Sequence, residues 1–98
     1  MSEGLKFDSD KPRWNLLPLA TGQEVVKVLT FGASKYGANN WQKLKDAKGR
    51  YSAALMRHLT QWQSGELTDR ESGLPHLAHV CTNAPFLLYF EQKKRRKA

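Results

Sequence analysis

RHLTQWQSGELTDRESGLPHLAHVCTN, residues 57–83, is typical of a helix, a short polar turn and a second helix. The stretch contains all three histidines of the chain, together with the carboxylates of Glu66 and Asp69. Small helical proteins build metal sites in this way, with ligands that project inward from two facing helices. We therefore expect the chemical centre of the protein to lie here.

Hydrophobic spacing along the whole chain predicts a small all-α domain with three helices, covering residues 21–36, 51–64 and 75–92. Thr21 and Glu24 have the spacing of a capping box at the start of the first helix. Prolines interrupt the preceding residues, so 1–20 are predicted to form an extended arm. The single domain is expected to span 1–98, with a basic tail at 93–98.

The length of the chain limits the core that it can build. A chain of 98 residues buries only about 60–70% of its unfolded surface. Three helices of this size leave apolar faces exposed, and we expect a homodimer or homotetramer to cover them.

The single cysteine, Cys81, excludes an intrachain disulfide and fits a reducing, cytoplasmic setting. The helical pattern predicts that Cys81 is a buried packing residue. No apolar run reaches the ~18 residues of a membrane span, and the N-terminus does not resemble a signal peptide. We therefore expect a cytoplasmic protein without membrane partners.

The net charge of +7 comes mostly from the run KKRRK at residues 93–97, which holds five of the sixteen basic residues. Such a run can contact nucleic acid through its phosphates. It is also favourable as a solvated helix end, because cations stabilise the C-terminus of a helix dipole. The residues leave both interpretations open.

The central stretch contains the candidate metal ligands. Glu66 and Asp69 have i, i+3 spacing, and His76, His79 and Asn83 form one polar stripe on an otherwise apolar helix. A single inward histidine is usually a hydrogen-bonded structural residue, but the whole set converges if the two helices form a hairpin. Oxygen and imidazole ligands fit Mg²⁺ or Mn²⁺, which supports phosphate chemistry. The expected metal ligands are Glu66, Asp69, Glu71, His76 and His79, and the expected catalytic residues are Glu66, Asp69, His58 and Arg57.

Cationic and aromatic residues outside this stretch suit a nucleotide. Aromatic faces can stack on a base, amides can pair with its edge, and lysine or arginine can meet phosphates. A helix cap followed by an anchoring tryptophan explains residues 36–41 equally well, and the arm can be a solvated surface strip. The expected substrate-binding residues are Lys6, Lys11, Arg13, Lys35, Tyr36, Asn40, Trp41 and Asn83.

Five blocks of sequence follow one another along the chain: KFD at 6–8, KPR and LLP within 11–18, VLTFGASKYG with NW within 28–41, ALMRHL at 54–59, and GE with DRESGLPHLAH within 65–79. In this order they resemble the phage-type dATP/dGTP diphosphohydrolases, the MazZ group of the MazG-like all-α nucleotide pyrophosphohydrolases. The resemblance covers about residues 4–90. It implies hydrolysis of a deoxynucleoside triphosphate to monophosphate and pyrophosphate, a divalent metal and a helical oligomer. Where the broader pattern has a second acidic pair, this chain has His76 and His79.

A function of a different class is also compatible with the sequence. The basic tail and the aromatic turn would suit a small protein that binds nucleic acid or sequesters nucleotides without hydrolysing them. A triphosphohydrolase of the His-Asp type is disfavoured, because the chain contains no His-Asp dipeptide.

Overall fold

The computed structural model describes residues 10–97, and in this range it confirms an all-α fold without strands. Residues 1–9 of the predicted arm, including Lys6, lie outside the described residues. None of the helices in 10–97 combines the length and the apolar character that a bilayer span requires. In chain order the elements are η1 (Trp14–Leu16), α1 (Leu19–Tyr36), η2 (Asn40–Lys43), α2 (Ala47–Gln63) and α3 (His76–Lys97).

The predicted capping box at the start of α1 is wrong. The helix begins two residues before Thr21, after Pro18, and no side chain caps it. Proline fixes φ near the helical value, which lets the helix start beside it. Glu24 consequently lies inside the helix, where it accepts a hydrogen bond from Lys27 at 2.9 Å.

The other two helices are longer than predicted. α2 begins four residues before Tyr51, because the backbone of Asp46 takes a left-handed conformation, with φ of 52°, and the chain turns directly into the helix. The sequence does not predict this first turn, because it contains Gly49 and glycine is a weak helix former. α3 continues through Pro85 to Lys97, so the basic run forms the last turns of a helix.

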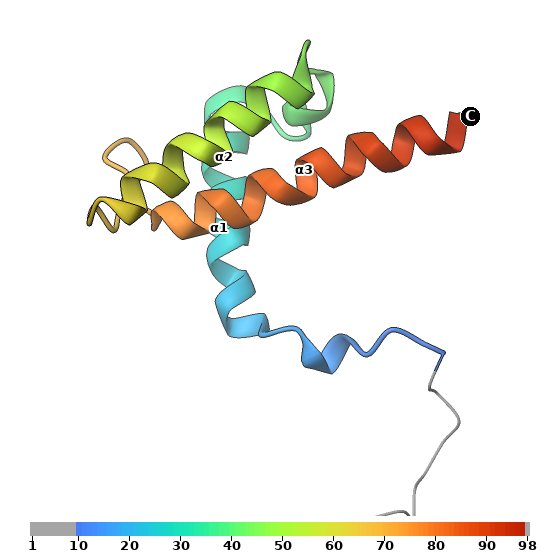
Figure 1. Ribbon diagram of the computed structural model, residues 1–98, viewed down its shortest axis with the longest axis horizontal. Helices are drawn as coiled ribbons and strands as arrows, with labels where there is room; N and C mark the ends of the chain where they lie inside the picture. Colours follow the sequence, from blue (N-terminus) through green and yellow to red (C-terminus); the bar gives the residue numbers. More distant parts are fainter. Residues whose placement is uncertain (1–9, 98) are drawn as a thin grey trace, which may run out of the picture.

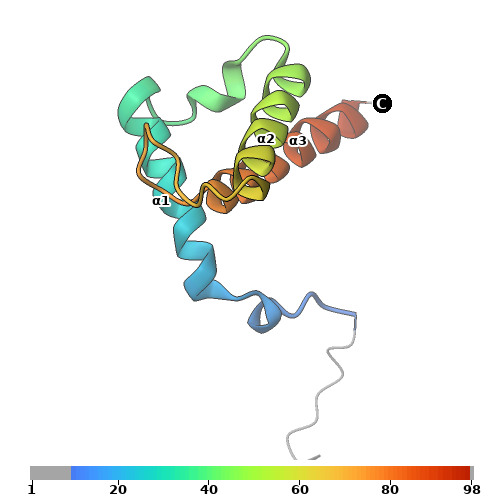
Figure 2. The same ribbon diagram turned by 60° about the vertical axis from the view of Figure 1, so that its left-hand side comes forward.

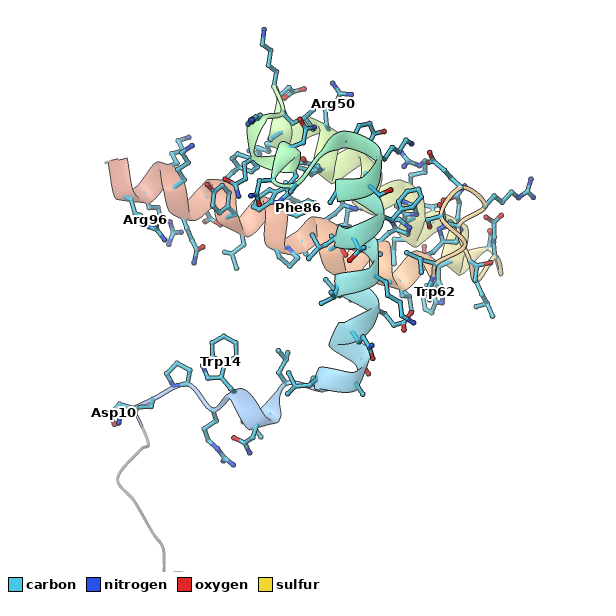
Figure 3. The ribbon with its side chains drawn as sticks, turned by 180° about the vertical axis from the view of Figure 1, so that it is seen from behind. Asp10, Trp14, Arg50, Trp62, Phe86 and Arg96 are labelled. Atoms are coloured by element: carbon cyan, nitrogen blue, oxygen red, sulfur yellow. The ribbon has the colours of Figure 1, made fainter. Side chains whose placement is uncertain are left out.

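α2 and α3 lie side by side and make the main helix pair of the fold, while α1 crosses α3 (Figure 1). The loop of residues 64–75 joins α2 to α3 as the predicted hairpin turn. It reaches towards the C-terminal end of α1 (Figure 2), where Lys35 of α1 pairs with Glu71 of the loop. The arm at residues 10–18 extends away from the helices, with Trp14 far from the rest of the chain (Figure 3).

The 64–75 loop is held by its own backbone. The amide of Asp69 donates to the carbonyl of Leu74 at 2.8 Å, and the amide of His76 donates to the carbonyl of Leu67 at 2.9 Å. Gly65 and Gly73 take positive φ angles of 106° and 73°, which side chains disfavour. These bonds and turns hold Glu66 and Asp69 against the start of α3.

An aromatic cluster fastens η2 to α3. The Trp41 ring stacks on Phe86 with centroids 4.4 Å apart, and its edge meets Tyr89 at 4.8 Å. Tyr51 of α2 tilts against Phe86 at 4.9 Å and donates a hydrogen bond to the carbonyl of Trp41 at 2.8 Å. The cluster therefore links three elements: η2, α2 and α3.

The polarity of α3 is inverted relative to an ordinary surface helix. The faces turned towards α1 and α2 bury His76, His79, Thr82 and Asn83, whereas Leu88 on the outer face is 53% exposed. Cys81 also lies on this outer face and is exposed, so the prediction that it is buried is wrong. The described chain buries only three apolar side chains, none larger than valine: Val28, Ala47 and Ala78.

Replacing Trp41 with alanine should destabilise the fold by about 2 kcal/mol, because the half-buried indole packs on three rings of α3. Urea unfolding measures the change. Trp14→Ala is the matched control, since that indole is 76% exposed. Equal stabilities of the two variants would contradict a structural role for Trp41.

Candidate functional site

The site lies where the 64–75 loop meets the facing sides of α2 and α3. α2 contributes His58, α3 contributes His76 and His79, and the loop contributes Glu66 and Asp69. One ligand atom from each of His58, Asp69 and His76 lies within 4.8 Å of the other two. The hairpin thus brings the predicted carboxylates and imidazoles together.

A chain of hydrogen bonds connects Glu66 to His58 through His76. Nε2 of His76 lies 2.9 Å from Oε2 of Glu66, and Nδ1 of His76 lies 2.8 Å from Nδ1 of His58. An ionised carboxylate only accepts hydrogen bonds, so His76 donates to Glu66 from Nε2 and accepts at Nδ1. His58 then donates from Nδ1, which leaves the lone pair on its Nε2 free to accept a proton or bind a metal.

His76 has no solvent exposure, and both of its ring nitrogens are engaged. In this arrangement His76 fixes the positions of the His58 ring and the Glu66 carboxylate. Acting as a metal ligand, as the sequence predicts, would require His76 to exchange one of these two bonds for the metal.

Ser72 organises the second carboxylate of the site. Its amide donates to Oδ2 of Asp69 at 2.8 Å, and its Oγ lies 2.8 Å from Nε2 of His79. Burial alone would raise the pKa of Asp69, but the bonds from Ser72 and the nearby imidazoles outweigh it and lower that pKa below 3.8. Asp69 is therefore ionised at neutral pH.

Two stacked imidazoles lie between α2 and α3. The rings of His58 and His79 are 4.2 Å apart and nearly parallel, at 8°. Burial, with the charges of His79 and Arg57, lowers the pKa of His58 from 6.5 to about 4. Burial also lowers the pKa of His79, so its 3.8 Å approach to Asp69 is not an ion pair at neutral pH. Both rings stay neutral, as base and ligand roles require.

Glu71 lies outside this inner group. Its carboxylate is 59% exposed and pairs with the ammonium of Lys35, which raises the pKa of that lysine. Arg57 is exposed beside His58, and its charge acts on both His58 and His79. The structure thus places one predicted metal ligand, Glu71, at the edge of the site, together with Lys35, a predicted substrate-binding residue, and Arg57, a predicted catalytic residue.

The remaining predicted binding residues are spread more widely. Asn83 is buried one turn after His79 and donates to the carbonyl of that residue at 2.8 Å. Trp41 borders a hollow of about 220 Å³, lined also by Val25, Leu29, Thr82, Pro85 and Phe86. The others are surface residues or stand at the edge of η2: Lys11, Arg13 and Tyr36 are exposed, and Asn40 is half-buried.

Comparison with known proteins shows the family of this chain. The sequence family described as "dATP/dGTP diphosphohydrolase, N-terminal" matches residues 1–98. The chain belongs to this family. A curated relative, the dATP/dGTP diphosphohydrolase of Salmonella phage PMBT28, is 36% identical over 86 residues, or 88% of this chain. The matched part is 29% of the length of that relative. No solved structure matches the chain.

The family membership confirms the resemblance that the sequence blocks indicate. Sequence reasoning nevertheless missed Ser72, the residue that joins Asp69 to His79. The spacing Asp-x-x-Ser was an available signal, because an aspartate that accepts from a backbone amide three residues later is a common turn. The hydrogen bond between the Ser72 hydroxyl and His79 depends on how α3 packs against the loop, so no local sequence pattern predicts it.

Acid should destabilise the metal-free protein between about pH 6.5 and pH 4. The unfolded chain protonates His58 near pH 6.5, whereas the folded chain resists protonation until about pH 4. The unfolded state binds more protons in this window, so the free energy of unfolding falls as the pH falls. Asp69 contributes only below its ordinary value of 3.8. Urea titrations in EDTA across the window measure the change.

His58→Gln is the matched variant, because glutamine keeps a polar side chain but does not titrate. Its stability should depend less on pH over the same window. A wild-type free energy of unfolding that stays constant from about pH 6.5 to pH 4 would contradict the neutral, buried state of His58.

Proposed function

We propose that the chain hydrolyses deoxynucleoside triphosphates, with purine bases preferred, to the monophosphate and pyrophosphate. Membership of the dATP/dGTP diphosphohydrolase family supports the reaction class. The observation that carries the proposal is the convergence of His58, Asp69 and His76 within 4.8 Å, inside the matched region.

The donor set fits a divalent metal. A carboxylate that is ionised at neutral pH stands beside neutral imidazoles, and this combination suits Mn²⁺ and also admits Mg²⁺. A bound ion would neutralise phosphate charge and favour deprotonation of the attacking water. Asp69 would hold it, with Glu66, His76 and His79 around it and Glu71 at the edge, while His58 stays free of the metal as the base.

The protein's own residues then position the reaction. The Glu66–His76 bond holds the imidazole of His58 with Nε2 unprotonated, so that Nε2 can accept a proton from water. Arg57 beside this ring supplies positive charge for the phosphates. Lys35 can reach the same phosphates once it leaves Glu71. Lys6, Lys11 and Arg13 of the arm remain predicted phosphate contacts.

The base would lie further along α3. Phe86 follows His79 by seven residues, a rise of about 10 Å, which is comparable to the span from a base to its outer phosphates. The hollow beside Trp41 and Phe86 offers an apolar surface at that distance. Asn83, between them, can orient the sugar, while Tyr36 and Asn40 are the predicted contacts for the base edge.

The first test is product analysis after incubation with each dNTP and NTP in the presence of Mn²⁺ or Mg²⁺. Release of monophosphate and pyrophosphate, strongest for dATP or dGTP, is the expected result. Binding of nucleotides without turnover would instead support the sequestering alternative, in which the imidazole cluster is structural.

Asp69→Asn should lower turnover by more than about a hundredfold, because the amide keeps the shape of the loop but loses the anionic ligand. Circular dichroism checks that the fold persists. Glu24→Gln is the matched control, since Glu24 is a part-exposed carboxylate that, within residues 10–97, forms its ion pair with Lys27 of its own helix. Full activity in Asp69→Asn would remove the metal assignment.

A further inference from the structure

The outer face of α3 has the spacing of a helix-pairing seam. Leu77, Cys81, Ala84 and Leu88 follow one another at intervals of four, three and four residues, the pattern of core positions in coiled coils. All four are exposed, with Leu77 at 39% and Leu88 at 53%. An unbroken apolar line on the surface indicates a contact with another molecule.

The need for such a contact follows from the small core. The face of α3 opposite the seam buries His79 and Asn83, and its apolar packing within one chain depends on Phe86 and Phe90 in the aromatic cluster. The described chain buries only three apolar side chains, Val28, Ala47 and Ala78. Covering the seam would supply apolar contacts that the single chain does not make.

We propose that α3 pairs antiparallel with α3 of a second copy through this seam, and that each copy thereby completes the phosphate site of the other. The two-fold axis passes between Cys81 and Ala84, so Leu77 meets Leu88 of the partner subunit and Cys81 meets Ala84 of the partner subunit. Large side chains pack at both ends, and small ones at the centre let the helices approach closely. The surface is thus complementary to itself, as a two-fold dimer requires.

The distribution of charged residues along α3 and the 64–75 loop favours a second copy of this chain as the partner, and it favours the antiparallel direction. The basic run Lys93, Lys94, Arg95 and Arg96 is exposed at the end of α3 that extends beyond α2, where Figure 3 shows Arg96. In the proposed register this run begins about 6 Å beyond the N-terminal end of the partner's α3. The 64–75 loop occupies that end and carries three acids and one arginine, Arg70, so it is negative overall. A parallel pair would instead place two basic runs together.

The functional part of this proposal rests on the proposed hydrolysis. Within one copy, Arg57 is exposed at the site and Lys35 is engaged by Glu71. Further cationic groups near the site would strengthen the binding of a triphosphate. The basic run of the other copy would supply them, so each site would be built from two chains.

The oligomeric state is the first measurement, by light scattering on the whole chain. The wild type should be a dimer and Leu88→Asp a monomer, because the aspartate would be buried opposite Leu77 of the partner subunit. Met56→Asp is the matched control, since Met56 is 55% exposed on α2 but lies off the seam. A monomeric wild type, or equal effects of the two variants, would overturn the pairing.

Disulfide cross-linking tests the register. In Ala84→Cys the new thiol faces Cys81 of the partner subunit, so mild oxidation should convert the dimer to a covalent one. The wild type and a Cys81→Ala, Ala84→Cys double variant should cross-link less, because their like cysteines are offset along the axis. Preferential linking of Cys81 to Cys81 in the wild type would indicate a parallel pair and overturn the proposal.

Mixing two variants with different defects tests the shared site. One chain carries Asp69→Asn and an intact basic run, and the other carries an intact loop with residues 93–96 replaced by glutamine. The second chain alone should show a KM for dNTP raised about tenfold. Mixed dimers should recover wild-type KM, since one site is then complete.

The absence of recovery by mixing would overturn the shared site. If the wild type hydrolyses no nucleotide at all, the proposed function fails, while light scattering and cross-linking still decide the pairing. The two failures are therefore distinguishable.

Discussion

Three imidazoles are buried between two helices, and the arrangement of the surrounding loop depends on the hydrogen bonds that these rings require. A buried polar group without a partner costs about 1–3 kcal/mol. Two of the rings pair with each other, and Glu66 and Ser72 of the 64–75 loop complete the set. The loop can supply these partners because backbone bonds at Asp69 and His76 hold it in one shape. Among the described residues, no buried side-chain nitrogen or oxygen lacks a hydrogen bond.

Helix content and the convergence of the histidines with Glu66 and Asp69 could be predicted from the sequence, because both depend on short spacings. The i, i+3 and i, i+4 intervals of His76, His79 and Asn83 place them on one face of any helix. The bonds between elements could not be predicted. No local sequence pattern around His58 or His76 indicates that their Nδ1 atoms form a hydrogen bond. In the sequence Glu71 is equivalent to Asp69, and only the ion pair with Lys35 of α1 distinguishes it.

The burial of Cys81 and the capping box at Thr21 failed for related reasons. In both cases the local pattern is present in the sequence, but the structure places these residues in a different environment from the one that the pattern predicts. Apolar spacing on α3 marks a face that packs, yet within one chain the packed face is the polar one. At α1, Pro18 started the helix earlier than the cap residues would have done. Tertiary packing and a fixed backbone angle each outweighed a weaker sequence preference.

The concentration of every histidine in one cluster makes the protein a convenient object for spectroscopy. In most proteins, imidazole signals from the surface must be separated from those of the site. Here the chain has only three histidines, and all are buried within the same cluster. Any imidazole resonance therefore belongs to the site without assignment by mutation, and isotope labelling of a single amino acid type would illuminate that region alone.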